Sequence, residues 1–162
     1  MAMEGSTETA PATGDLLYEA FYGAALGGAA IAIFFLAADT IAGRPLYTPS
    51  LLGEVLFTGA DPTAVEVVRL EMVAYFSGVH LVAFLLLGLC TSWLCRVTGI
   101  SKRDLPVVTG VVFLMLTGAF FGGDLLLFPG VAVTIGIPEL LLGNFLAAAV
   151  MGVFLRKAHA DD

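Results

Sequence analysis

The chain has few charged side chains, and very few of them are basic. Only 13% of its 162 residues are Asp, Glu, Lys or Arg, and seven are Lys or Arg. A nucleic-acid footprint needs basic residues clustered on one surface, so these counts and their scatter exclude one. Hydrophobic residues make up 59% of the chain and the mean hydropathy is +0.96. Soluble domains contain about 45–50% apolar residues, so an ordinary soluble domain is excluded too.

Charge is missing altogether from four segments, residues 20–38, 72–95, 105–123 and 140–155. A helix of about 20 residues crosses the ~30 Å hydrocarbon core of a bilayer. The segments therefore predict an all-α membrane protein, a bundle of four transmembrane helices at about residues 16–41, 66–97, 106–128 and 138–156. This single transmembrane domain, residues 15–157, is expected to follow a disordered acidic tail (1–14) and to precede a short C-terminal tail (158–162).

The first 19 residues contain no Lys or Arg, which argues against a cleaved signal peptide. Four spans place both termini and the second loop on one side of the membrane. That side carries Arg96, Lys102, Arg103, Arg156 and Lys157, and the opposite side carries only Arg44 and Arg69. The positive-inside rule therefore predicts cytoplasmic termini in a multi-pass protein of the cell inner membrane.

The first external loop is longer than a simple turn. Thr48 and Pro49 are typical of the cap and first position of a helix, so a short interfacial helix is expected there. Asp61 is the expected N-cap of the second span, which then continues to about Val97. Pro138 opens the fourth span, with Glu139 in its first turn, where the helix dipole favours an acid.

Small residues mark the expected packing faces. Gly28 and Ala32 stand four residues apart in the first span, and Gly143 and Ala147 repeat that spacing in the fourth. Such pairs let helix backbones approach closely, and they fit either packing within the chain or an interface between subunits.

Polar side chains inside the spans give the candidate site. Asp39, Glu71, Asp124 and Glu139 are expected near the outer face, with His80 and Asn144 deeper by roughly 10 Å. The candidate polar cluster comprises His80, Asp124, Asn144, Asp39 and Glu139. Ionisable groups in a membrane tend to face a bundle interior or a cavity, as in a proton relay, a cation or metal site, or a ligand pocket. The structural alternative leaves the acids at the interface and pairs His80 with Asp124 or with a backbone carbonyl.

Other chemistries lack the residues that they need. His80 is the only histidine within a span, so one chain cannot supply the two imidazoles of a transmembrane haem. Cys90 and Cys95 are separated by four residues and form no redox pair. We expect no catalytic residues and no cofactor, and the sequence does not identify a metal.

Two segments share a faint similarity. Residues 34–39 and 120–124 both contain a Phe pair followed by an Asp near the outer face, and Pro49 and Pro138 follow later. Parallel repeats occur in transporters, but Phe, Leu and Gly are common in any span, so chance similarity is the favoured interpretation.

The most distinctive string, from Asp39 to Gly53, has the pattern D-x-x-x-G-R-P-x-x-T-P-x-x-L-G. It resembles a motif of uncharacterised small bacterial four-helix integral membrane proteins. The resemblance covers about a fifth of the chain and implies a topology but no activity. Physically, the motif makes a sharp exit from the membrane, in which Gly43 ends the helix and Arg44 is expected to pair with Asp39.

Two function classes fit the sequence. The first is a non-catalytic accessory or scaffold subunit of a larger membrane complex, in contact with lipids and with a membrane-protein partner or further copies of itself. The second is a small oligomeric transporter, channel or ligand-binding membrane protein that uses the outward-facing polar cluster. An enzyme that borrows a metal or quinone at the same cluster is a more distant third.

Overall fold

The computed structural model describes residues 13–98 and 104–158, and these form helices joined by short connections, with no strand among them. The helices are α1 (Thr13–Ile41), α2 (Tyr47–Thr58), α3 (Leu70–Thr98), α4 (Leu105–Leu126), α5 (Val131–Ile135) and α6 (Ile137–Ala158), with one 3₁₀ turn at Pro62–Ala64. Four of them, α1, α3, α4 and α6, are long and apolar enough to cross a membrane, which confirms the prediction of four such helices. Of the predicted tails, residues 1–12 and 159–162 lie outside the described residues, and Thr13 and Gly14 already belong to α1.

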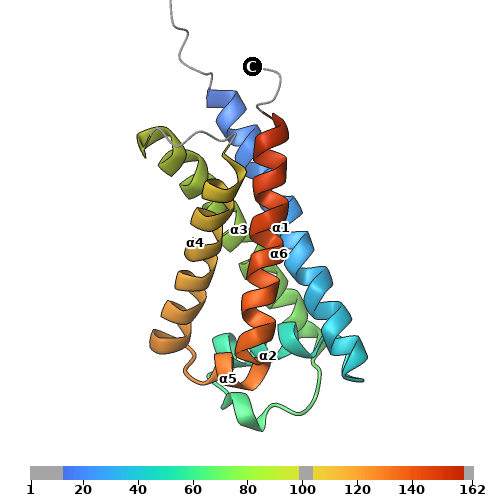
Figure 1. Ribbon diagram of the computed structural model, residues 1–162. Helices are drawn as coiled ribbons and strands as arrows, with labels where there is room; N and C mark the ends of the chain where they lie inside the picture. Colours follow the sequence, from blue (N-terminus) through green and yellow to red (C-terminus); the bar gives the residue numbers. More distant parts are fainter. Residues whose placement is uncertain (1–12, 99–103, 159–162) are drawn as a thin grey trace, which may run out of the picture.

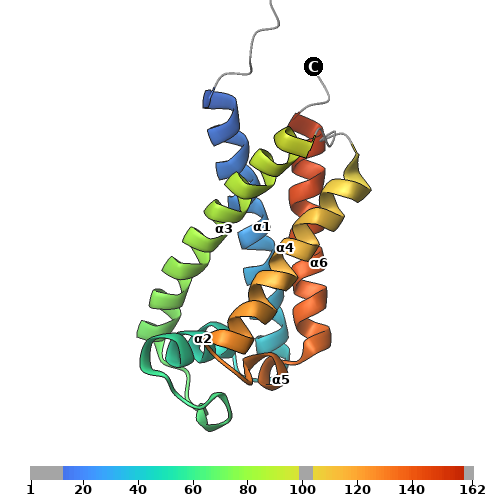
Figure 2. The same cartoon turned by 90° about the vertical axis from the view of Figure 1, so that its left-hand side faces the viewer.

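The four long helices run along the length of the molecule, and α2 and α5 lie together at one end of it (Figure 1, Figure 2). Helix α1 packs against both α3 and α6, and α4 packs mainly against α6. Helices α1 and α6 therefore form the centre of the bundle, while α3 and α4 flank it and bury less of their surface. The start of α1 and the end of α6 lie at the end opposite α2.

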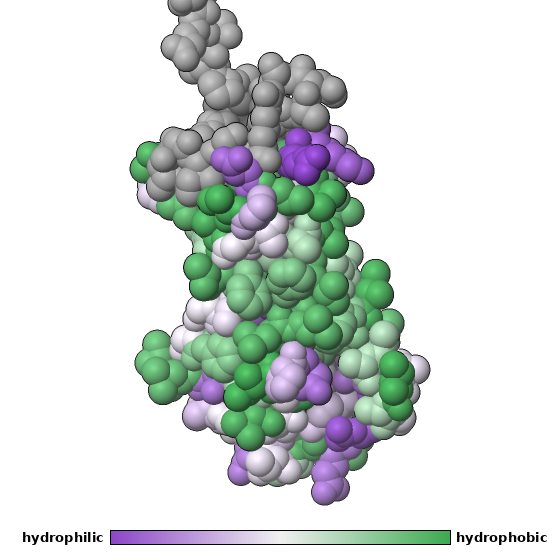
Figure 3. Space-filling model, viewed as in Figure 1, coloured by the Kyte–Doolittle hydropathy of each residue, from purple (hydrophilic) through white to green (hydrophobic). Residues whose placement is uncertain are grey.

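Apolar side chains cover most of the visible face along the middle of the bundle, and polar residues gather towards its ends (Figure 3). Among the exposed side chains are Ile33, Leu81, Leu114 and Phe145, which lie on four different long helices. A surface of this kind would be costly in water and is stable against hydrocarbon, as expected of a multi-pass membrane protein.

Two groups of buried side chains hold the fold together. The larger lies between the long helices and includes Ile31, Phe84, Val112, Ala147 and Met151. The smaller, formed by Tyr47, Leu51, Val55 and Val131, joins α2 to α5 at the end of the bundle. The two short helices are thus packed into the structure, and each helps to fix the ends of the long ones.

Glycines bring the helix backbones together at particular points. A Cβ on Gly88 of α3 would lie 2.5 Å from the carbonyl oxygen of Ala20 in α1, and a Cβ on Gly53 of α2 would collide with the backbone carbonyl of Met72 in α3. No side chain larger than hydrogen fits at either place unless the backbones separate. Helix α3 is therefore held closely against α1 at one point and against α2 at another.

The predicted packing residues lie inside the chain in three of four cases. Gly143 and Ala147 of α6 are buried, and a Cβ on Gly143 would lie 3.1 Å from the rings of Phe34 and Phe35. Gly28 is buried against α3, but Ala32 is exposed on the wall of a cavity.

Several local predictions differ from the structure. Asp61 caps only the 3₁₀ turn, by accepting from the backbone N–H and the hydroxyl of Thr63, at 2.8 and 2.7 Å. The second span begins at Leu70, later than predicted, because the Val-rich residues 65–69 are not helical. β-Branched residues favour extended backbone, and the Arg69 N–H is bound by the Ser50 hydroxyl at 2.8 Å.

Both short helices also begin differently from the prediction. Helix α2 starts at Tyr47, after Leu46 in a left-handed conformation (φ 66°), so Thr48 is its second residue and not its cap. Helix α5 was not predicted, and it lies between the expected third and fourth spans. Gly130 adopts φ 94°, a value that favours glycine, and leads directly into the new helix.

Candidate functional site

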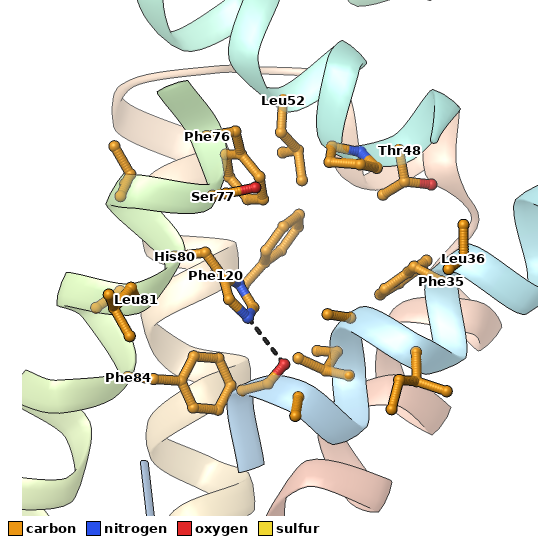
Figure 4. Close-up of a pocket in the computed structure, with 18 of the residues that line it drawn as sticks. Phe35, Leu36, Thr48, Leu52, Phe76, Ser77, His80, Leu81, Phe84 and Phe120 are labelled. Atoms are coloured by element: carbon orange, nitrogen blue, oxygen red, sulfur yellow. Dashed lines mark hydrogen bonds between the residues drawn. The ribbon is translucent and has the colours of Figure 1, made fainter. Parts of the chain in front are cut away.

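A cavity of about 640 Å³ lies between α1 and α3, with α2 across one end and α4 and α6 behind it. Most of its lining is apolar, and the rings of Phe35, Phe76, Phe84 and Phe120 surround the space (Figure 4). Exposed residues such as Ile33 and Leu81 also belong to the lining, so the cavity opens sideways through the surface of the bundle. In a bilayer this opening would face the hydrocarbon core.

The cavity exists because α1 and α3 cross and then separate towards α2 (Figure 2). Their close approach at Ala20 and Gly88 continues to Gly28, where a Cβ would lie 3.3 Å from the Phe84 ring. Beyond that point the α1 side of the cavity includes the small side chains of Ala29 and Ala32, beside larger ones such as Phe35. Diverging axes and small side chains together leave the volume unfilled.

His80 is the central polar group of the cavity, and Figure 4 shows its ring pointing towards α1. Its Nε2 lies 3.1 Å from the carbonyl oxygen of Gly28, and its ring centroid lies 4.7 Å from that of Phe84 and 5.9 Å from that of Phe76. A carbonyl oxygen only accepts, so Nε2 carries the proton of this hydrogen bond. In the neutral ring, Nδ1 is then left as an acceptor.

Asn144 of α6 contributes the second polar group. Its side chain is only 3% exposed, and its amide nitrogen donates to the Thr117 hydroxyl of α4 at 3.3 Å. No side-chain nitrogen or oxygen of the described residues is both fully enclosed and without a partner. The unbonded Oδ1 of Asn144 and Nδ1 of His80 must therefore reach open space, and the cavity is the space that both residues line.

Two further members of the predicted cluster bind backbone instead of one another. Asp39 is buried at the end of α1 and accepts the N–H of Thr48 at 2.7 Å and its hydroxyl at 2.8 Å. Asp124, at the end of α4, accepts the N–H of Ala132 at 2.7 Å. Each carboxylate thus lies at the positive end of a short helix, where an anion is favoured.

The structure therefore distributes the predicted cluster over three places. His80 and Asn144 line the cavity, Asp39 and Asp124 cap α2 and α5, and Glu139 lies exposed in the first turn of α6. Within the described residues no hydrogen bond joins His80 to Asp124. His80 instead uses a backbone carbonyl, one of the arrangements that the sequence left open.

The basic residues of the external loop also have partners other than the predicted one. The Arg44 guanidinium carbon lies 3.9 Å from the centre of the Tyr47 ring, a cation–π contact, and Asp39 is bound by Thr48 in its place. Arg69 pairs with Glu54 of α2 at 3.0 Å and also with Glu71. The hydrogen bond to Glu71, followed by the negative charges of Glu54 and Glu71, holds the pKa of the Arg69 guanidinium above its usual value.

Sequence reasoning named His80 and Asn144 but missed the aromatic residues beside them. Phe76, His80 and Phe84 follow one another at four-residue spacing, which places them on one stripe of α3. That spacing was the available signal.

No group of three or more His, Cys, Asp or Glu side chains is placed to hold a metal ion in residues 13–98 and 104–158. Cys90 is exposed and free. In comparisons with known proteins, no family model, no curated protein and no solved structure matches the chain.

Proposed function

We propose that this protein binds a neutral, lipophilic small molecule in the cavity between α1 and α3. The observation that carries the proposal is the cavity itself, a largely apolar space of about 640 Å³ whose polar groups are a few fixed side chains. Ligand sites are typically about 300–1,000 Å³ in volume and combine an apolar lining with a small number of convergent polar groups. A lateral opening gives a lipophile a route from the bilayer.

The charge of the lining supports a neutral ligand. None of the described residues around the cavity is Asp, Glu, Lys or Arg. Moving an ion into such a space without a counter-charge would cost several kcal/mol. An inorganic ion, an anionic phosphate head group or a protonated amine is therefore a poor candidate, and transport of ions through this cavity is disfavoured.

The proposal includes a membrane orientation. Placing α2 and α5 at the outer interface and both termini in the cytoplasm follows from the basic residues Arg156 and Lys157 at the end of α6 and the rule that such residues stay inside. Asp39 and Asp124 would then lie close to the outer head groups. The bacterial inner membrane is also part of this proposal, and it rests on the resemblance of residues 39–53 to a motif of small bacterial membrane proteins.

Photolabelling tests the proposed site. The purified protein in lipid nanodiscs is irradiated with a long-chain alkane that carries a diazirine, and labelled peptides are identified by mass spectrometry. We expect labelling concentrated on α1 and α3 residues that line the cavity. Ala32→Phe, which fills the cavity, should reduce this labelling several-fold, whereas Ala37→Phe, on an exposed part of α1 outside the lining, should not. Labelling spread evenly over all lipid-facing helices would contradict the proposal.

An accessory or scaffold subunit is the second candidate. The observation that favours it is α4, the least buried of the four long helices. On its surface, Cβ atoms added at Gly110, Gly118 and Gly122 would meet nothing within 4 Å, whereas Gly152 of α6 packs closely against α4. A partner helix would find room for close backbone contact there.

Purification in mild detergent tests this second candidate. A stoichiometric protein partner that is lost from the Gly118→Leu variant and kept by Gly78→Leu, an equally open glycine on α3, would support it. A chain that purifies alone from native membranes would oppose it.

A further inference from the structure

We infer that the ligand of the cavity between α1 and α3 is a lipophilic alcohol, a molecule whose hydroxyl donates a hydrogen bond to Nδ1 of His80. The inference rests on the proposed function and specifies the chemistry of the molecule bound. It follows from which hydrogen-bond donors and acceptors around the cavity already have partners.

The donors of the cavity are nearly all occupied. His80 Nε2–H donates to the Gly28 carbonyl at 3.1 Å, and the Ser77 hydroxyl donates to the Val73 carbonyl at 2.7 Å. The Thr48 hydroxyl donates to Asp39 at 2.8 Å. Asn144 uses one of its two N–H groups on Thr117. A ligand that only accepts hydrogen bonds, such as a ketone, an ester or an ether, would find one remaining side-chain N–H.

The hydrogen-bond acceptors of the cavity, by contrast, are largely unoccupied. Nδ1 of His80 and Oδ1 of Asn144 have no hydrogen-bond partner among the described residues, and both reach open space. A buried acceptor left unpaired loses the hydrogen bonds that it would make in water, so a ligand that supplies a donor removes this cost. The cavity thus matches a ligand that donates.

Among donors, the chemistry of the lining selects a hydroxyl. An ammonium group would need a carboxylate, and no acid lines the cavity in the part of the chain that the structure describes. A hydroxyl is neutral and donates one hydrogen bond, and its own oxygen can accept from the spare N–H of Asn144. The aromatic rings of Phe35, Phe84 and Phe120 suit the apolar body of such a molecule, and the lateral opening lets a long chain extend into the bilayer.

His80 is held in the orientation that recognition needs. Its ring is flanked by Phe76 and Phe84 on the same helix, and the Gly28 carbonyl fixes both the ring and its tautomer. Glycine at position 28 favours this arrangement, because a Cβ there would lie 3.3 Å from the Phe84 ring, closer than an ordinary van der Waals contact. The acceptor is therefore positioned before the ligand arrives, which lowers the cost of binding.

The test uses two photoreactive probes of equal chain length, a diazirine-bearing hexadecanol and its methyl ether, with the full chain in nanodiscs. One hydrogen bond is lost in the ether, so we expect the alcohol to label the cavity about fivefold more efficiently. In His80→Phe, which keeps an aromatic ring between Phe76 and Phe84, the two probes should label equally. Thr40→Val is the control, because Thr40 lies outside the cavity lining and its hydroxyl donates to the backbone carbonyl of Leu36, and this variant should keep the preference for the alcohol.

The labelling results distinguish the proposal of a ligand site from the inference that its ligand is an alcohol. Equal labelling by both probes in the wild-type protein overturns the alcohol and leaves the ligand site standing. Absence of cavity labelling by either probe removes the proposed function itself.

Nuclear magnetic resonance provides a second measurement that does not depend on the folding of the His80 variant. In ¹⁵N-histidine-labelled wild-type protein, unlabelled hexadecanol should shift the Nδ1 resonance of His80 in the direction of hydrogen-bond acceptance, and its methyl ether should not. An unchanged Nδ1 resonance at saturating alcohol would overturn the inference.

Discussion

Asp39 and Asp124 make the same hydrogen bond in the two halves of the chain. Each ends a long helix, and each accepts the backbone N–H of the second residue of the short helix that follows, Thr48 in one half and Ala132 in the other, both at 2.7 Å. Both short helices also begin after a residue of left-handed conformation, Leu46 or Gly130. The faint sequence similarity around the two acids thus coincides with a shared local structure. Its second part does not, since Pro49 lies in α2 and Pro138 in α6.

The two caps should differ in strength. Asp39→Ala removes two hydrogen bonds to a buried carboxylate and should lower the free energy of unfolding by roughly 3 kcal/mol, whereas Asp124→Ala removes one and should cost roughly half as much. Thr48→Val, which keeps the N–H and loses the hydroxyl, should cost roughly 1 kcal/mol. Unfolding of the detergent-solubilised protein by denaturant measures all three. Equal effects of the two Asp substitutions would show that the second hydrogen bond of Asp39 contributes nothing.

Gly88→Ala should destabilise the bundle. The added methyl group would lie 2.5 Å from the Ala20 carbonyl oxygen, so α1 and α3 must separate, at a cost of roughly 1–3 kcal/mol. Gly118→Ala, on an open face of α4, is the control, and it should be neutral or slightly stabilising because alanine favours the helix. Thermal unfolding should give a midpoint below the wild-type value for Gly88→Ala and a midpoint at or slightly above it for Gly118→Ala. A stable Gly88→Ala protein would mean that the two backbones are farther apart than the structure has them.

The ion pair between Arg69 and Glu54 should be measurable by a double-mutant cycle. Glu54 is buried and Arg69 is half exposed, so solvent weakens their interaction, and we expect a small favourable coupling between Arg69→Ala and Glu54→Gln. Raising the salt concentration should weaken it. Additive effects of the two substitutions would contradict a direct interaction.

Asp61 should titrate at low pH. The hydroxyl and backbone N–H of Thr63 bind its carboxylate and hold the pKa below the usual value of about 3.9 for an aspartate. A group with a depressed pKa in the folded protein stabilises the fold above its unfolded pKa, and that contribution is lost as the pH falls through the folded pKa. In Thr63→Val the hydroxyl is gone and the pKa of Asp61 should rise towards the usual value. Nuclear magnetic resonance of the Asp61 side-chain carbonyl follows both titrations, and an unaltered pKa in the variant would refute the assigned cause.

The sequence predicted the long helices well because their signal is length. Four uncharged segments gave the four spans, and each predicted boundary falls within about four residues of the helix end. The short elements carry weaker signals. Val131–Ile135 has five residues, and its N-cap residue, Gly130, has no side chain that could mark the start of a helix. Residues 65–69 depart from helix through β-branched side chains and a contact from Ser50, which is distant in sequence.

The candidate site was predictable only in part. Polar residues in apolar spans are conspicuous, so His80 and Asn144 were named. Their hydrogen-bond partners, the Gly28 carbonyl and the Thr117 hydroxyl, lie on other helices and depend on how those helices cross. The expected pairing of Arg44 with Asp39 was wrong for the same kind of reason, since a backbone N–H and a hydroxyl from α2 occupy the carboxylate and the Tyr47 ring occupies the guanidinium.

Helix α2 keeps α1 and α3 apart at one end of the bundle. Helices α1 and α3 cross at Ala20 and Gly88, and α2 lies between their ends on the far side of this crossing. Helix α2 is joined to α1 by the hydrogen bond from Thr48 to Asp39, and it packs against α3 through the contact of Gly53 with Met72. The stretch of α2 from Thr48 to Gly53 thus holds α1 and α3 at a set distance beside the cavity, and Thr48, Pro49 and Leu52 of this helix line it. Substitutions in α2 alone could therefore adapt the cavity to a smaller or larger ligand, without a change in any residue of the long helices.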